Sequence, residues 1–206
     1  MTQVALREPR RNEDLGQWMT DPRLARALVR WAGVRRGEHV LEPGAGSGNL
    51  IEACLEAGAH VTALELDPRW CAFLRQRFRT ARVGVHRADF LAGDTYFGSR
   101  APTLSVLNPP FEDDQEGRWI AEAVARTGRA AAIIRLHGLA GITRLEQCWA
   151  RVRLTRAAVC VPRPPFHGSG VHEICVVECV PRARPRSPQG EDVIRFGHLH
   201  WQEGGA

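Results

Sequence analysis

The residues best suited to chemistry in this chain form a short turn, Asn108-Pro109-Pro110-Phe111. An apolar run at 103–107 precedes it and reads as a buried strand, which the two prolines end because proline has no N–H for a ladder and fixes its own φ. The turn therefore presents an amide oxygen, a proline carbonyl and an aromatic ring from one rigid point. That set suits an amino group on a planar aromatic substrate, although a Pro-Pro loop that merely ends a strand remains the plain alternative.

A second candidate site is the glycine loop Glu42-Pro43-Gly44-Ala45-Gly46-Ser47-Gly48. Glycines allow close approach of a backbone to a ligand, and an acidic residue at the end of the next strand, here Glu65, can accept hydrogen bonds from both hydroxyls of a ribose. A nicotinamide dinucleotide would require G-x-G-x-x-G and a pyrophosphate at the helix N-terminus. Here the spacing is G-x-G-x-G beside Glu42, and a carboxylate repels a pyrophosphate but attracts an ammonium or a sulfonium.

S-adenosylmethionine carries both of those cationic groups and no phosphate, so we predict it as the cofactor, with a nicotinamide cofactor as the alternative. Asp89, at the end of the third predicted strand, could accept a hydrogen bond from the adenine amine of this cofactor. Phe90 and Leu66 could supply apolar walls. The residues that follow the first four predicted strands all suit this cofactor or its substrate. Together they indicate it more strongly than the glycine loop alone.

The elements that must position these residues alternate between strand and helix. A helix is expected after Asp21 as N-cap and Pro22 in the first turn, with Gly33 as its stop. Strands follow at 39–42, 60–64, 82–86 and 103–107, with helices at 50–58 and 67–78 between the first three. This alternation predicts an α/β, Rossmann-like, doubly wound and mostly parallel sheet in a single domain.

The second half completes a sheet of seven predicted strands. Those at 130–136, 154–161 and 171–180 are joined by helices at 118–127 and 141–152 and by a Pro-rich loop at 162–170. We expect a catalytic domain at 1–180, in which residues 1–20 cover the cofactor or the substrate. Residues 181–206 read as a Pro- and Arg-rich tail that is loose or forms a short edge strand near 193–196.

The charge of the chain is unevenly distributed. The net charge is +5, all 28 basic residues are arginine, and the segment 118–163 holds nine arginines against two glutamates. Because phosphate neutralisation supplies most of the sequence-independent affinity for nucleic acids, this positive segment favours a polyanionic partner. A solvated arginine-rich face is the alternative.

Other features favour a reduced, soluble setting. No apolar run approaches the ~20 residues of a membrane span, and 1–14 lacks a signal-peptide core, so we expect a cytoplasmic protein that does not enter a membrane. Six cysteines without CxxC spacing read as core thiols. Neither Cys175 with Cys179 nor His198 with His200 has further ligands nearby, so no metal is predicted. We expect a monomer or a weak dimer.

Together, Glu42 to Gly48, Glu65, Asp89-Phe90 and Asn108-Pro-Pro-Phe111 resemble the motifs of class I S-adenosylmethionine-dependent methyltransferases. In that class N/D-P-P-Y/F is typical of enzymes that methylate an amino nitrogen conjugated to a π system, above all N6 of adenine. The resemblance implies a catalytic turn of Asn108, Pro109, Pro110 and Phe111. Asn108 Oδ1 and the Pro109 carbonyl would accept the two amine hydrogens, and Phe111 would stack on the base.

Two subfamilies compete for the substrate. Leu15-Gly-Gln17 with Thr20-Asp-Pro22 is similar to the start of ribosomal RNA adenine dimethyltransferases, which implies cofactor roles for Gln17 and Thr20. That family, however, has N-L-P-Y or a close relative at the turn and an additional helical domain for which no residues remain here. The predicted cofactor-binding residues are Gln17, Thr20, Glu42, Pro43, Gly44, Ala45, Gly46, Gly48, Glu65, Leu66, Asp89, Phe90 and Asn108.

The later stretches, Ile133-Ile-Arg135-Leu136 and Arg163-Pro164-Pro-Phe166, resemble small phage- and plasmid-type DNA adenine methyltransferases. We therefore predict N6 methylation of adenine in DNA, with DNA favoured over RNA as the partner and Phe111, Arg163 and Phe166 as substrate-binding residues. Methylation of adenine in ribosomal or transfer RNA, or of a protein glutamine at N5, is the alternative. Loops at 112–117 and 162–170 are expected to recognise the target, and a non-catalytic binding module is disfavoured because every expected side chain is present.

Overall fold

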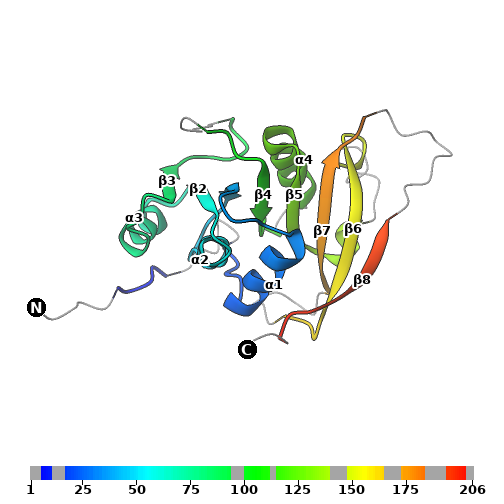
Figure 1. Ribbon diagram of the computed structural model, residues 1–206, viewed down its shortest axis with the longest axis horizontal. Helices are drawn as coiled ribbons and strands as arrows, with labels where there is room; N and C mark the ends of the chain where they lie inside the picture. The colour runs from blue at the N-terminus through cyan, green and yellow to red at the C-terminus, as the bar shows by residue number, and fades with distance from the viewer. Residues whose placement is uncertain are drawn as a thin grey trace, which may run out of the picture.

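The sheet places β1 and β4 at its centre, with the other strands extending outward from them. A computed structural model describes residues 6–10, 17–93, 100–111, 115–139, 148–164, 173–183 and 194–202, and within them the strand order is β3-β2-β1-β4-β5-β7-β6-β8 (Figure 1). The strands are β1 (His39–Pro43), β2 (His60–Glu65), β3 (Val83–Arg87), β4 (Leu104–Leu107), β5 (Ala130–Arg135), β6 (Val152–Val161), β7 (Ile174–Pro181) and β8 (Arg195–His200). The helices are α1 (Pro22–Ala32), α2 (Asn49–Glu56), α3 (Pro68–Arg77) and α4 (Glu116–Thr127), with a 3₁₀ helix, η3 (Leu136–Leu139).

The first five strands are parallel, as predicted. β1 pairs with β2 on one side and with β4 on the other, so the winding direction reverses between β1 and β4. β7 is antiparallel to both β5 and β6. In a doubly wound sheet, ligands bind beyond the carboxyl ends of the strands at such a switch point, so β1 and β4 mark where a site belongs.

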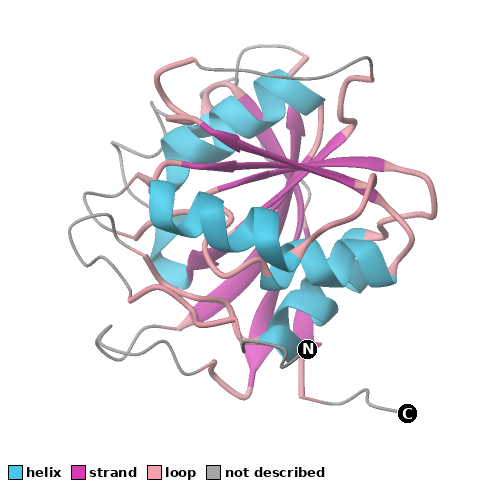
Figure 2. Ribbon diagram, turned by 90° about the vertical axis from the view of Figure 1, so that its left-hand side faces the viewer, coloured by secondary structure: helices cyan, strands magenta, loops and turns pink. Residues whose placement is uncertain are grey.

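Two buried clusters cover the two faces of the sheet. Helices lie on both sides of the sheet (Figure 2). Helices α1, α2 and α3 pack against one face, and α4 packs against the other. Consecutive residues of one strand serve opposite faces, as where Val40 joins the first cluster and Leu41 the second. Both faces are therefore apolar, which explains why these strands read as continuous hydrophobic runs.

The predicted helix boundaries of α1 and α3 are confirmed by their caps. Asp21 Oδ1 accepts a hydrogen bond from the backbone N–H of Arg23 at 2.7 Å, and Asp67 Oδ1 accepts one from Arg69 at 2.8 Å. Each helix has proline in its first turn, where the missing N–H costs nothing. Gly33 ends α1 in the left-handed conformation at φ 67°.

The C-terminal part differs from the prediction in two ways. The predicted helix at 141–152 extends too far, because Val152 begins β6, where it pairs with Pro181 and is buried; residues 141–147 lie outside the described part. β8 adds an eighth strand parallel to β6, beginning at Arg195 and continuing past the predicted edge strand. Buried Trp201 follows it and donates its Nε1–H to the Pro162 carbonyl at 2.5 Å. Within the described ranges, every helix is too short or too polar to cross a membrane.

Candidate cofactor and acceptor site

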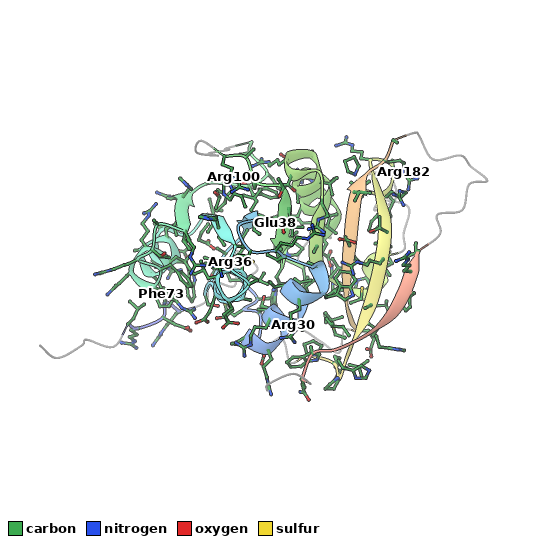
Figure 3. All side chains as sticks on the ribbon, viewed as in Figure 1. Arg30, Arg36, Glu38, Phe73, Arg100 and Arg182 are labelled. Atoms are coloured by element: carbon green, nitrogen blue, oxygen red, sulfur yellow. The ribbon has the colours of Figure 1, made fainter. Side chains whose placement is uncertain are left out.

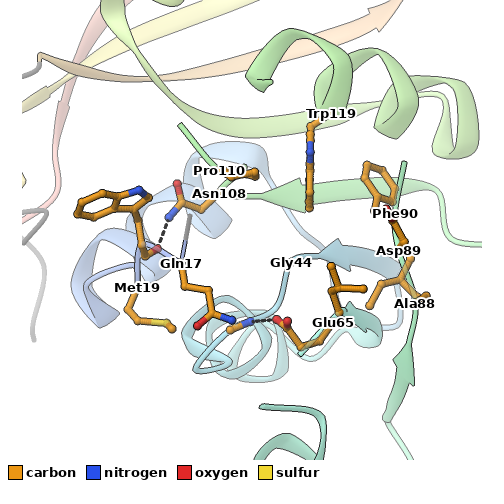
Figure 4. Close-up of a pocket in the computed structure, with 14 residues that line it drawn as sticks. Gln17, Met19, Gly44, Glu65, Ala88, Asp89, Phe90, Asn108, Pro110 and Trp119 are labelled. Atoms are coloured by element: carbon orange, nitrogen blue, oxygen red, sulfur yellow. Dashed lines mark hydrogen bonds between the residues drawn. The ribbon is translucent and has the colours of Figure 1, made fainter. Parts of the chain in front are cut away.

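The carboxyl ends of β1, β2 and β4 surround one pocket (Figure 4). Its walls come from the segment before α1, the glycine loop, the end of β2 with the residue that follows it, the segment after β3, the turn after β4 and the first turn of α4. The lining residues are Gln17, Trp18, Met19, Gly44, Gly46, Leu64, Glu65, Leu66, Ala88, Asp89, Phe90, Asn108, Pro110 and Trp119. Long-range folding thus brings together half of the residues that the sequence proposed separately.

Glu65 ties the glycine loop to the end of β2. Its Oε2 accepts the backbone N–H of Gly46 at 2.8 Å, and its Oε1 accepts that of Asp67 at 2.9 Å. Burial raises the pKa of Glu65, although these two hydrogen bonds oppose the shift. Each carboxylate oxygen can accept more than one hydrogen bond, so Glu65 can still take the hydroxyls of a ribose.

Glu42 is a buried carboxyl at the end of β1. It is 1% exposed, and its Oε2 has no hydrogen-bond partner among the described residues. Burial raises the pKa of Glu42 well above its usual value, and the neighbouring Glu65 adds to the rise. Glu42 lines a small cavity that shares Gly44, Gly46 and Asn108 with the main pocket. A buried carboxyl with an unpartnered oxygen among the described residues suits a cationic ligand at this place.

Asn108 emerges directly after β4 with its two amide atoms in different situations. Nδ2 donates a hydrogen bond to the main-chain carbonyl of Trp18 at 2.8 Å, while Oδ1 is buried and accepts none within the described part of the chain. Pro110 beside it lines the pocket. Among the described residues the turn therefore offers a buried acceptor without a donor, and its role toward a substrate amine stays a prediction.

Phe111 does not line the pocket as the base-stacking prediction requires. Its ring is 6% exposed and belongs to the core cluster beneath α1 and α2. The Arg135 guanidinium lies 5.7 Å from the ring centroid, and Glu116 binds that guanidinium with both carboxylate oxygens at 2.7 and 2.9 Å. The role of Phe111 against a substrate base stays a prediction.

The three loop glycines have different functions. Gly44 and Gly46 line the pocket with φ values of 69° and 50°, a region that favours glycine. Gly48 is needed for packing, because a Cβ there would lie 2.5 Å from Phe78 Cε2 and 2.7 Å from Leu74 Cδ2. Gly48 thus allows the end of α3 to pack against the start of α2, and its assignment to the cofactor stays a prediction.

The remaining predicted residues divide between the pocket and its surroundings. Asp89 lines the pocket and also accepts the Leu91 N–H at 2.9 Å, which shapes the turn after β3. Thr20 and Ala45 line the small cavity, and Pro43 is buried outside both. Arg163 is exposed and is not a lining residue, and Phe166 lies outside the described residues.

Trp18, Met19 and Trp119 are pocket residues that sequence reasoning missed. The Trp119 ring would lie 3.1 Å from a Cβ on Gly44, and Met19 Sδ would lie 3.0 Å from one on Gly46. Trp119 also contacts Phe90 at a centroid distance of 5.0 Å. These side chains reduce the cavity to about 100 Å³, below the ~300–1,000 Å³ of typical ligand pockets, so a ligand as large as S-adenosylmethionine requires them to move.

Residues 9–109 match the family described as ribosomal RNA adenine dimethylase. The ribosomal RNA small subunit methyltransferase A of Mycobacterium avium is 48% identical over 111 residues, which make up 50% of this chain and 35% of that relative. The chain therefore matches only about a third of the length of this curated relative.

Two solved structures share the fold across most of the chain. A dimethyladenosine transferase from Plasmodium falciparum superimposes with a TM-score of 0.59 at 17% identity, covering 81% of this chain and 64% of that one. A type I restriction-modification methyltransferase subunit from Streptococcus thermophilus gives a TM-score of 0.64 at 13% identity, covering 84% and 47%. The two structures confirm the class I methyltransferase fold. The family match agrees with the predicted cofactor, S-adenosylmethionine.

Proposed function

We propose that this class I methyltransferase transfers a methyl group from S-adenosylmethionine to the N6 amine of adenine in RNA, with ribosomal RNA as the substrate class. The observation that carries the proposal is the Oδ1 of Asn108, which is buried and has no partner among the described residues, at the edge of the pocket that also holds Glu65 and the glycine loop. A buried hydrogen-bond acceptor without a donor lowers the stability of the folded protein, because it has lost its bonds to water. A ligand that supplies the donor removes this penalty. An exocyclic amine is such a donor.

The residues of the pocket fit the cofactor. Glu42 would face its cationic groups, Glu65 its ribose hydroxyls, and Leu66 with Phe90 the faces of its adenine, while Gly44 and Gly46 would permit close approach. When bound, S-adenosylmethionine supplies an electrophilic methyl group on a sulfonium.

The reaction needs positioning more than it needs a base. Asn108 Oδ1 and the Pro109 carbonyl would accept the two amine hydrogens, which draws the nitrogen toward sp³ geometry and directs its lone pair at the methyl group. No general base is required, because the methylated amine becomes strongly acidic as the N–C bond forms. Positioning of this kind can supply ~7–11 kcal/mol of the barrier. A paired adenine must first be flipped out of its helix.

The family match and the 48% identical relative favour RNA over the DNA substrate predicted from the later loops. The likeness to the restriction-modification subunit, at 13% identity, supports the fold alone. Most of the stretches that suggested DNA lie after residue 109, where the family match ends. RNA is therefore the main proposal, and DNA is an outcome that the experiment distinguishes.

The test is transfer of labelled methyl to unmodified small-subunit ribosomal RNA, duplex DNA and protein extract side by side, followed by nucleoside analysis. We expect N6-methylated adenosine in the RNA. Asn108→Ala should lower the single-turnover rate by about 10²–10³, the loss seen when one positioned polar group is removed, with cofactor affinity nearly unchanged. Label in DNA or glutamine, or a wild-type rate in Asn108→Ala, would overturn the proposal.

A further inference from the structure

The amide of Asn108 has a defined orientation because of a contact 90 residues away in sequence. Its Nδ2 donates to the Trp18 carbonyl at 2.8 Å, and its Oδ1 is buried with no donor among the residues described (Figure 4). An amide can be turned over with almost no change in shape, but its two ends have opposite hydrogen-bonding character. The reversed orientation would place Oδ1 against the Trp18 carbonyl, with both atoms acceptors, and would aim an NH₂ group at the incoming amine.

The segment that supplies this carbonyl, residues 17–20, which we call the strap, is attached on both sides of Trp18. Gln17 Oε1 accepts the Nε1–H of Trp70 in α3 at 3.0 Å. The Thr20 carbonyl accepts Nδ2–H of Asn49 in α2 at 2.8 Å. The Trp18 carbonyl is therefore held in place by helices of the cofactor half, while the atom it orients belongs to the acceptor turn.

We propose that the main-chain carbonyl of Trp18 is a positioning group that selects the productive orientation of Asn108. The inference rests on the proposed function and adds a condition to it: position 108 must donate toward the strap and accept from the substrate at the same time. An amide does both at every pH. The strap thereby makes the acceptor geometry depend on contacts at α2 and α3.

Asn108→Asp tests this condition. A carboxylate has only acceptors, so one of its oxygens would face the Trp18 carbonyl with no hydrogen between them. A protonated carboxyl restores the pattern, with O–H toward Trp18 and C=O toward the amine. Burial against a carbonyl also favours the neutral form. The activity of Asn108→Asp should therefore rise as the pH falls.

The matched control is Asn49→Asp. This substitution makes the same chemical change at a second asparagine that donates to a strap carbonyl but does not contact the substrate amine in the proposed mechanism. Arg77 Nη1 lies 3.4 Å from Asn49 Oδ1 and would keep an introduced carboxyl ionised. A general disturbance of the strap would thus appear in Asn49→Asp as a constant loss of rate at all pH values.

The measurement is the single-turnover rate of each variant divided by that of the wild type, at saturating S-adenosylmethionine, between pH 5.5 and 8.5. We expect the ratio for Asn108→Asp to increase with acidity by up to about tenfold per pH unit, and the ratio for Asn49→Asp to stay flat. A flat or base-enhanced ratio for Asn108→Asp, or the same slope in both variants, would overturn the role of Trp18. Failure of the wild type to methylate any adenine would instead overturn the proposed function.

Discussion

At the scale of single residues, Glu42 is a buried carboxyl that lines the small cavity beside the pocket. Its carboxyl is buried with one oxygen unpaired among the described residues, and burial raises its pKa. A carboxyl whose pKa is higher in the folded state than in the unfolded state favours the folded state least when it is ionised. At low pH it therefore has no effect on the free energy of unfolding, and it lowers that free energy progressively as the pH rises toward the folded-state pKa. Without a ligand, ionisation of Glu42 places a charge in the interior of the protein, and a bound cation would offset the cost of burying that charge.

Glu42→Gln should separate these two effects. Without cofactor, we expect the variant to melt above the wild type at pH 8, with ~2–4 °C for each kcal/mol gained, and the difference to disappear toward pH 5. Calorimetric scans across this range measure it, and binding of S-adenosylmethionine at pH 8 should weaken in the same variant. Equal melting temperatures at pH 8 would show that Glu42 is not destabilising when ionised.

At the scale of elements, the acceptor turn is supported by an ion pair between the start of α4 and the end of β5. Glu116 is 1% exposed and holds Arg135, whose guanidinium covers Phe111. Both side chains of the pair are almost fully buried, so removal of either one would leave the other charge in the interior without this partner. It connects the helix that carries Trp119 to the ring that follows the two prolines.

Glu116→Ala should therefore be strongly destabilising. Loss of one partner of a buried pair costs about 3–5 kcal/mol, because the other charge loses its counterpart. Glu52→Ala is the control, since Glu52 pairs with Arg77 at 2.7 Å on a partly exposed surface, where such pairs are worth ~0–1 kcal/mol. Urea unfolding compares the two, and similar losses would mean that Glu116 contributes no more than a surface charge.

At the scale of the whole molecule, only part of the positive charge predicted to bind nucleic acid lies on the α4 side of the sheet: Arg118 and Arg151 do, whereas Arg129 and Arg156 contact α1 and form ion pairs. Arg118 and Arg151 are exposed, form no ion pair within the described ranges, and line a groove of about 730 Å³ between α4 and the neighbouring ends of β6 and β7. Leu91 and Arg118 of this groove adjoin Phe90 and Trp119 of the pocket in sequence. We predict that a bound nucleic-acid strand follows this groove.

Arg118→Gln and Arg151→Gln should each weaken RNA binding and reduce the slope of log affinity against log salt by ~0.7–0.9. Arg30→Gln is the control: Arg30 is also exposed but lies on α1, on the opposite face of the sheet (Figure 3). Filter binding between 50 and 300 mM salt measures the slopes. If the variant that carries both substitutions had the same salt slope as the wild type, these arginines would belong to a solvated surface that does not bind RNA.

The sequence by itself determined the local features of this protein. Caps at Asp21 and Asp67, prolines after β4 and glycines with positive φ act within a few residues, so their effect can be read from the chain. Alternating strands and helices then specified a doubly wound sheet, which places Glu42, Glu65 and Asn108 at one edge.

Only the tertiary structure decided which partners meet across that edge. The strap reaches Asn108 over 90 residues, Gly48 is required by the packing of Phe78 and Leu74, and Phe111 turns into the core rather than toward the pocket. Contacts of this kind depend on the packing of side chains from distant elements, and no spacing in the sequence encodes them. The orientation of the Asn108 amide depends on such a contact, because its partner is a backbone carbonyl, which every residue type possesses.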